Sequence, residues 1–266
     1  MNSGIRKSRW LVLLGASSLF WACAEEAAEP VSATPDSSAS EVVEAPPEFD
    51  PFSAAQPRVS RLSQRQYTRT IQDVFGADIV VPKNLEPDLE QHGLFSVGST
   101  ISSVSPLGVE RYADAAASIV SQLLDSPEKR DALILCEPTG VDDAGCLNEV
   151  ISTWGGRLWR RPLTEDETTN LVALGIASAE VMESFDEGVR YAMLAILQSP
   201  LFMYRIELGE EVDGVRQYTN YEMASRLSYG LWNTCPDEEL LAAAEAGELT
   251  DDAGLENQVE RLLSSE

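Results

Sequence analysis

Several arginines of this 266-residue chain stand inside apolar stretches, as in WGGRLWRRPL, LFMYRIE and ASRLSYGLW. A guanidinium is costly to bury unless a carboxylate meets it, and its planar fork suits bidentate pairing and stacking on aromatic rings. These side chains could therefore line an anion-binding cleft, or they could act as ion-pair braces between helices. The residues concerned are Arg157, Arg160, Arg161, Arg190, Arg205 and Arg226.

Acidic side chains offer a second chemistry, because two carboxylates can hydrolyse a glycosidic bond without a histidine. The acids of this chain gather in short runs such as Glu165–Glu167 and Asp237–Glu239, at expected helix starts. There they complement the helix dipole, which explains them without catalysis. A hydrolase that acts on an envelope or extracellular polymer through carboxylates and arginines therefore remains the alternative to a non-catalytic role.

Other reactive groups are scarce. His92 is the only histidine, and the sequence contains no GxSxG, P-loop, HExxH, GxGxxG after a strand, or CxxCH haem-attachment motif. We interpret His92 as a solvated loop residue. We expect no metal site and no cofactor.

The cysteines indicate an oxidising compartment. Cys136 and Cys146 bracket the turn-rich loop EPTGVDDAG, so we predict a disulfide between them. Cys235 is left over, and it is either a buried inert thiol or a reactive one.

The N-terminus has the layout of a signal peptide over residues 1–22. Arg6, Lys7 and Arg9 precede an apolar run to Ala22, which is shorter than the roughly 20 apolar residues that a membrane span needs. We therefore expect export from a bacterial cytoplasm.

The end of this run, Leu19-Phe20-Trp21-Ala22-Cys23, resembles the lipobox of bacterial lipoproteins. The resemblance implies that Cys23 is lipidated and anchors the protein in a membrane, with ordinary secretion as the alternative. Ala24 in the next position favours the outer membrane as the address within the cell envelope.

The formal net charge of the chain is −25, and no basic stripe is present. Such a surface repels phosphate backbones, which excludes nucleic-acid binding. Residues 23–57 are rich in Pro, Ala, Ser and Glu and poor in large apolar residues, so we expect a disordered acidic tether.

Beyond the tether, helix-start signals predict an all-α, multi-helix bundle. Capping boxes, in which Ser or Thr precedes Glu or Gln by three residues, begin four of the expected helices. Proline at the first helical position begins two more. The starts are Ser63 with Gln66, Thr164 with Glu167, Ser184 with Glu187, Thr219 with Glu222, Ser105-Pro106 and Cys235-Pro236.

Further apolar stripes predict one helix through Leu147 and Leu158 and another through Leu255 and Leu263. Period-two alternation is arguable only around residues 79–81. We expect helical modules over residues 58–135 and 136–216, and the start of a third, incomplete module over 217–266.

A long loop separates the first two expected helices, from Ala77 to about Val104. Long loops are often functional or mobile. The alternative is that this loop wraps over a helix pair through Leu85, Leu94 and Phe95.

Four stretches of the body resemble a family of exported planctomycete and myxobacterial proteins built of domains of unknown function. They are RLSQRQYTRTIQDVFG, WGGRLWRRPLTEDE, YAMLAILQSPLFMYRIE and EMASRLSYGLWNTCPDEELL. Members often accompany c-type cytochrome modules and continue past the last of these motifs, so the resemblance implies that the present chain is either a short form without a haem motif or a truncated gene product. The resemblance implies a c-type cytochrome or another envelope protein as partner, and a non-catalytic interaction or binding role in a surface assembly.

Overall fold

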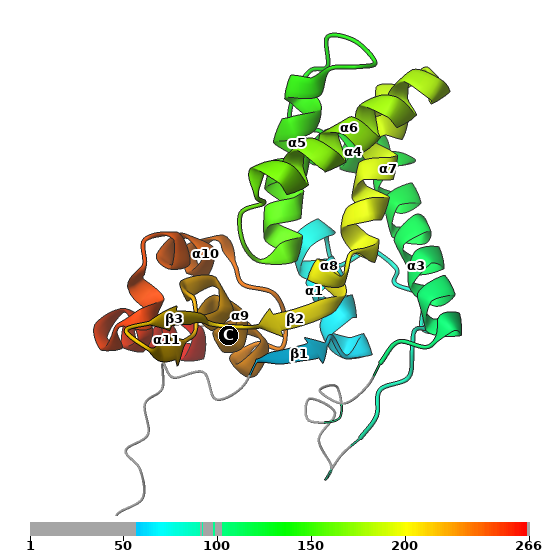
Figure 1. Cartoon of the computed structure of the whole chain (residues 1–266). Coiled ribbons are helices and arrows are strands. Elements are labelled where there is room, and N and C mark those ends of the chain that lie inside the picture. The colour runs from blue at the N-terminus through cyan, green and yellow to red at the C-terminus, as the bar shows by residue number, and fades with distance from the viewer. Residues whose placement is uncertain (1–56, 91, 93–97, 99–102, 265–266) are drawn as a thin grey trace, which may run out of the picture. The chain divides into compact units, whose positions relative to one another are not determined.

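A computed structural model describes residues 57–90, 92, 98 and 103–264 of the chain. The predicted signal peptide (1–22), Cys23 and all of the tether except Pro57 lie outside the described residues. The described part is mainly helical, as predicted (Figure 1). Its helices are α1 (Gln64–Phe75), α3 (Pro106–Leu124), α4 (Pro127–Leu133), α5 (Ala144–Trp159), α6 (Glu165–Met182), α7 (Phe185–Gln198), α8 (Pro200–Met203), α9 (Asn220–Leu231), α10 (Glu238–Glu245) and α11 (Asp252–Ser264), with a 3-10 turn at Glu248–Thr250.

Three of the four predicted capping boxes are present in full, at the starts of α1, α6 and α9. At the fourth, the Ser184 hydroxyl accepts from the Glu187 amide, but the carboxylate of Glu187 does not return to the cap. Instead it accepts a hydrogen bond of 3.0 Å from Arg190 Nε. One half of this capping box is therefore replaced by an ion pair.

The predicted start of α10 at Cys235-Pro236 was wrong by two residues. The helix begins at Glu238, and the Asp237 carboxylate caps it by accepting from the Leu240 amide. Because the same carboxylate also pairs with Arg261 at 2.7 Å, the cap is fixed by a contact with α11.

Two short antiparallel strand pairs accompany the helices. Strand β1 (Arg58–Arg61) pairs with β2 (Tyr204–Glu207), and β3 (Glu210–Val212) pairs with β4 (Val215–Gln217). The alternation around residues 79–81 was misleading, because no strand forms there. Strands β1 and β2 pair although more than 140 residues of sequence lie between them. Neither segment by itself therefore predicts this strand pair.

The described residues form two apolar cores. The larger core takes side chains from α1, α3, α5, α7 and α8, and the smaller one lies among α9, α10 and α11. Two residues of the C-terminal part, Tyr229 and Cys235, are buried in the larger core. The C-terminal helices are therefore joined to the rest of the body through its interior.

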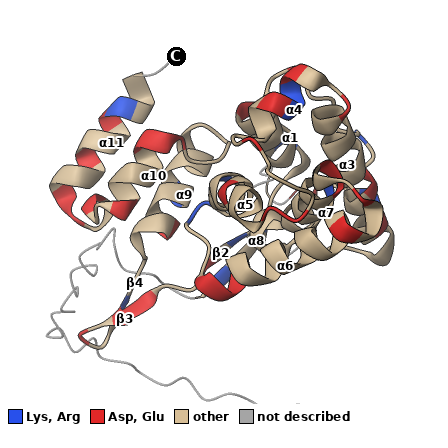
Figure 2. Cartoon of the chain, turned by 90° about the horizontal axis from the view of Figure 1, so that it is seen from above, with Lys and Arg blue, Asp and Glu red and all other residues tan. Residues whose placement is uncertain are grey.

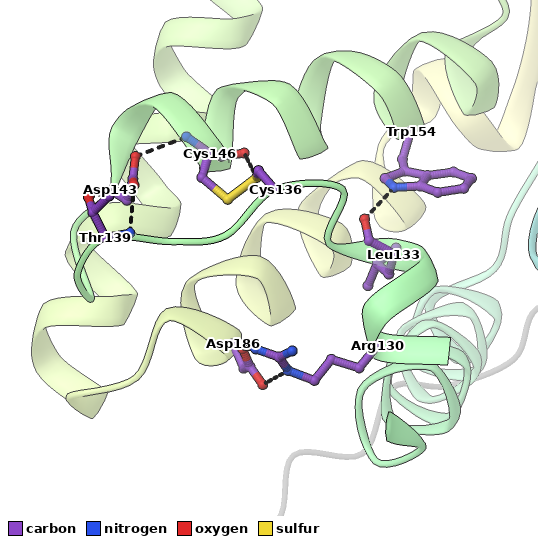
Figure 3. The surroundings of a disulfide bond; sticks show 8 residues. All are labelled: Arg130, Leu133, Cys136, Thr139, Asp143, Cys146, Trp154 and Asp186. Atoms are coloured by element: carbon purple, nitrogen blue, oxygen red, sulfur yellow. Dashed lines mark hydrogen bonds and ion pairs between the residues drawn. A yellow bond between two sulfur atoms is a disulfide. The ribbon is translucent and has the colours of Figure 1, made fainter. Parts of the chain in front are cut away.

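The predicted disulfide between Cys136 and Cys146 is present, with their Cα atoms 5.6 Å apart (Figure 3). Asp143 caps α5 beside it and accepts from the backbone amides of Cys146 and Thr139. These hydrogen bonds lower the pKa of Asp143 to about 2. The disulfide therefore secures a loop that already caps the following helix.

The first part of the long loop is held against β1 by Arg61, whose side chain is fully buried. Arg61 donates to the Pro87 carbonyl, to Asp88 at 3.1 Å and to the Tyr112 hydroxyl at 2.8 Å. Leu85 is buried in the core, as expected of a loop that wraps over helices. Leu94 and Phe95 lie outside the described residues.

Acidic residues are spread over α3, α6, β3, α10 and α11 (Figure 2). Within the part of the chain that the structure describes, no helix is both long enough and apolar enough to span a membrane.

Candidate functional site

Two of the predicted arginines stack on one buried tyrosine. The guanidinium carbons of Arg160 and Arg205 lie 5.8 and 5.5 Å from the centre of the Tyr229 ring. Burial raises the pKa of Tyr229, and its hydroxyl lies 3.0 Å from that of Thr70. The Tyr229 ring thus contacts two guanidinium groups, one from the residue that follows α5 and one from β2.

Glu207 joins the second of these arginines to a third. Its side chain is only 4% exposed, and it lies 2.8 Å from Arg226 and 3.9 Å from Arg205. Arg226 also covers the ring of Tyr218 at 4.3 Å. Desolvation nevertheless lowers the pKa of Arg205, because Glu207 compensates its burial only in part.

Arg160 pairs with no carboxylate among the described residues and uses its donors on backbone carbonyls instead. It follows α5 in the left-handed conformation, with φ of 62°. Its two terminal nitrogens donate at 2.6–3.2 Å to the carbonyls of Leu158, Leu201, Phe202 and Tyr204. These are carbonyls at and beyond helix ends, which a cation satisfies favourably. Arg160 therefore acts as a brace between α5 and the segment from α8 to β2.

Arg161, the next residue, forms a bidentate ion pair with Glu167 at 2.7 and 2.9 Å. This pair lowers the pKa of Glu167 to about 2 and raises that of Arg161. Since Glu167 also completes the capping box of α6, the ion pair fixes the turn between α5 and α6.

Arg157 differs from Arg160 and Arg161 in its hydrogen bonding. It makes no hydrogen bond with any other described residue, and its Nε is buried without a partner. Its contacts are the Trp154 ring at 5.9 Å and the carboxylate of Glu238 at 3.7 Å. Glu238 is 83% exposed, so this pairing is weak.

The structure does not bring Arg190 to the other five arginines. Arg190 lies on α7 and contacts Glu187 at 3.0 Å, the Ser121 hydroxyl at 3.2 Å and Asp125 at 3.5 Å. It therefore links α7 to α3.

Two pockets adjoin the arginine cluster and share Arg161 and Tyr221 in their walls. The first, of about 380 Å³, is mainly apolar and aromatic, with walls from α5, α8, β2 and α9. The acidic residue in its wall is Glu222, whose carboxylate accepts hydrogen bonds from the backbone amides of Leu208, Gly209 and Thr219. The second, of about 300 Å³, lies between α5, α9 and α10 and contains Arg157. Further lining residues of the first pocket are Trp159, Arg160, Leu201, Tyr204, Ile206 and Ser225.

Sequence reasoning missed the groups that organise this region. Glu207 and Tyr229 lie in the motifs YRIE and SRLSYGLW beside arginines that were identified, but only the fold shows that they face those arginines. Tyr221, which lies in the walls of both pockets, carried no signal beyond its place on an amphipathic helix. Arg61 was also missed. It is a buried arginine that donates to the carbonyls of Glu86 and Pro87 and to the carboxylate of Asp88.

The remaining candidate groups are Cys235 and His92. Cys235 is free and buried, and desolvation raises the pKa of its thiol. His92 is exposed. Across the described residues, no three His, Cys, Asp or Glu side chains are grouped as metal ligands.

Comparison with known protein families found three matches in succession along the chain. PSD3, a protein of unknown function (DUF1587), matches residues 60–125. PSD5, a protein of unknown function (DUF1595), matches residues 146–207, and PSD4, a protein of unknown function (DUF1592), matches residues 218–266. Comparisons with curated proteins and with solved structures found no match. The arginine cluster lies where the second and third of these regions meet, and the chain is therefore built from three consecutive domains of the PSD type, each of unknown function.

Proposed function

We propose that this protein is a lipid-anchored component of the bacterial cell envelope whose PSD domains form a non-catalytic binding module. Its partner in this proposal is a surface assembly that includes a c-type cytochrome. The anchor is the lipidated Cys23, and residues 23–57 form the tether to the folded body.

The main observation in favour of a non-catalytic role is that the charged side chains at the domain junction are engaged in structural hydrogen bonds. Arg160 donates to carbonyls at helix ends, Arg161 donates to Glu167 in the turn before α6, and the Glu222 carboxylate accepts from backbone amides of the segment before α9. The pKa shifts found here, to about 2 for Glu167 and upward for Cys235, move these groups away from neutral pH. General acid–base catalysis favours a pKa near the working pH, so this arrangement suits a structural and binding role.

The charge of the chain supports a protein partner of opposite charge. A formal net charge of −25 creates a field that attracts a basic protein and speeds its docking at low ionic strength. The acidic residues on α3, α6, α10 and α11 would provide the contacts (Figure 2).

The proposal is tested by isolating the protein from its own cell envelope with a mild detergent. The intact mass should equal that of the chain from Cys23 onward plus its acyl groups. A reduced-minus-oxidised visible spectrum of the same fraction should contain c-type haem bands, and these should be lost when the salt concentration is raised.

Cys23→Ala is the matched variant, since it removes the acceptor of the lipid and leaves the described body unchanged. It should release the protein from the membrane fraction. A wild-type protein whose mass shows no lipid would refute the anchor. A solitary, haem-free protein in gently solubilised envelopes would refute the cytochrome assembly.

A further inference from the structure

We infer that the pocket of about 300 Å³ between α5, α9 and α10 is a binding site for a short zwitterionic peptide, with Arg157 holding its carboxylate and Glu245 its ammonium group. The inference concerns a small ligand of the folded body and does not depend on the lipid anchor or on the cytochrome partner. We call this pocket the Arg157 pocket.

The pocket is formed where the second and third PSD domains meet. Helix α5 contributes Ser152, Thr153 and Arg157, α9 contributes Tyr221, and α10 contributes Glu238 and Glu245. Its volume lies at the lower end of the range for small-ligand sites, which begins at about 300 Å³. A compact ligand with a few polar groups would fill it.

Of the two arginines in the walls of this pocket, Arg157 is the one that makes no hydrogen bond to a described residue. Arg160 donates four hydrogen bonds to backbone carbonyls, and the guanidinium of Arg161 donates two to the Glu167 carboxylate. Arg157 has no hydrogen bond to any described residue, although its Nε is buried. A buried donor without a partner is costly, and a carboxylate is the group that fits the guanidinium fork.

Glu238 occupies the place of the ligand carboxylate only loosely. Its oxygen is 3.7 Å from the Arg157 nitrogen, which is beyond hydrogen-bond distance, and its side chain is largely exposed. A ligand carboxylate can therefore displace Glu238 at little cost. Displacement would move the acidic side chain into solvent and leave Arg157 with a complete pair.

Glu245 determines the second charge of the ligand. It stands at the opposite end of α10 from Glu238, about 10 Å away along the helix at 1.5 Å per residue. It acts on Tyr221, whose pKa is raised by burial and by the charge of Glu245. A purely anionic ligand, such as phosphate, would be repelled at this end, whereas an ammonium group would be attracted.

The distance between the two charged ends sets the length of the ligand. An extended peptide covers at most about 3.3–3.6 Å per residue, so roughly three residues span the pocket. Tri-alanine is therefore the probe, because it carries both charges and no large side chain.

The experiment is isothermal titration of the purified full chain with tri-alanine, with its C-terminal amide, with its N-acetyl form and with inorganic phosphate. Tri-alanine should bind, and the amide should bind at least about tenfold more weakly because a charge-assisted hydrogen bond is lost. The N-acetyl form should also bind more weakly than tri-alanine. No binding of tri-alanine at millimolar concentrations, or equal binding of phosphate, would overturn the inference.

Two variants locate the binding in the Arg157 pocket. Arg157→Gln should weaken tri-alanine binding at least about tenfold. Glu238→Gln should strengthen it several-fold, because the competing carboxylate is gone. Glu239→Gln is the matched control, since it removes the same charge from the same turn of α10 at a residue outside the pocket.

Glu245→Gln completes the test. It should weaken the binding of tri-alanine and leave that of the N-acetyl form unchanged, because only tri-alanine carries the ammonium group. Since Glu238 and Glu245 are on the outside of α10, their variants remain informative even if Arg157→Gln lowers the stability of the fold. Affinities that do not change with Glu238→Gln and Glu245→Gln would refute the assignment.

Discussion

The hydroxyl groups of Thr70 and Tyr229 lie 3.0 Å apart inside the protein, although 159 residues separate them in the sequence. Thr70 belongs to α1 in the first PSD region, and Tyr229 belongs to α9 in the third. Both side chains are buried, and Tyr229 packs in the larger apolar core. The contact shows that the third region is joined to the first by a buried polar pair as well as by apolar packing.

Replacing either partner of this pair should destabilise the whole body. Tyr229→Phe and Thr70→Val each remove one hydroxyl and leave the other buried without its partner, which costs about 1 kcal/mol or more. The double variant should lose less than the sum of the two, because the interaction can be lost only once. Guanidinium unfolding measures the three free energies.

Tyr191→Phe is the control for this cycle, because Tyr191 lies on α7 and is 41% exposed. Its effect should stay within about 0.5 kcal/mol. Strictly additive losses at Thr70 and Tyr229 would contradict a direct interaction.

Arg157 and Arg160 should respond very differently to substitution, although they are only three positions apart in the sequence. Arg160→Met leaves four backbone carbonyls without their donor, and we expect a loss of at least about 3 kcal/mol in the free energy of unfolding. Arg157→Gln removes no hydrogen bond to a described residue and should cost about 1 kcal/mol or less. Chemical denaturation of both variants measures these two free energies of unfolding. Equal losses would contradict the predicted difference between Arg157 and Arg160.

The ion pair of Arg161 with Glu167 should make part of the stability depend on pH. The pKa of Glu167 is lowered to about 2 in the folded protein, from an ordinary value of about 4.3. Its contribution is therefore present above about pH 4.5 and is lost as the pH falls toward 2. Because the pair is partly exposed, we expect about 1 kcal/mol at neutral pH.

Glu167→Gln, measured against wild type from pH 7 to pH 2, tests this dependence. The difference in unfolding free energy should shrink below pH 4.5 and nearly vanish at pH 2. Glu165→Gln is the control, since Glu165 occupies the same first turn of α6 and has no ion pair with a described residue. A difference that stays constant over this range would contradict the assignment.

The disulfide should contribute measurably to thermal stability. Cys136→Ser with Cys146→Ser opens a short loop, and the chain-entropy model gives a loss of roughly 3 kcal/mol. Scanning calorimetry should show a lower Tm for this double variant, and a reductant should lower the Tm of the wild type toward it. The reductant should leave the double variant unchanged, because its Cys235 is a free thiol.

Local signals explain why much of the fold could be predicted. Ser63, Thr164 and Thr219 cap their helices as expected, because a capping box satisfies backbone amides within four residues of sequence. Cys136 and Cys146 are close in sequence, so their pairing needed little tertiary information. The predicted start of α10 was displaced. Its capping residue, Asp237, also pairs with Arg261 on α11, and the sequence near the cap does not show this contact.

The candidate site could be predicted only in part. The sequence showed which arginines stand in apolar surroundings, and five of the six lie at the junction of the second and third PSD regions. It could not show that Arg160 meets carbonyls, that Arg161 meets Glu167, or that Arg157 meets neither. Those differences depend on which backbone ends and carboxylates the fold carries to each guanidinium.

By itself, the sequence determined the helical class, the main helix starts, the disulfide and the acidic character of this protein, because each depends on residues that are near one another or on composition. Only the tertiary structure decided the pairing of β1 with β2, the burial of Tyr229 against Thr70, and the free donors of Arg157. These depend on contacts between segments far apart in the chain, and their geometry exists only after the apolar cores have formed.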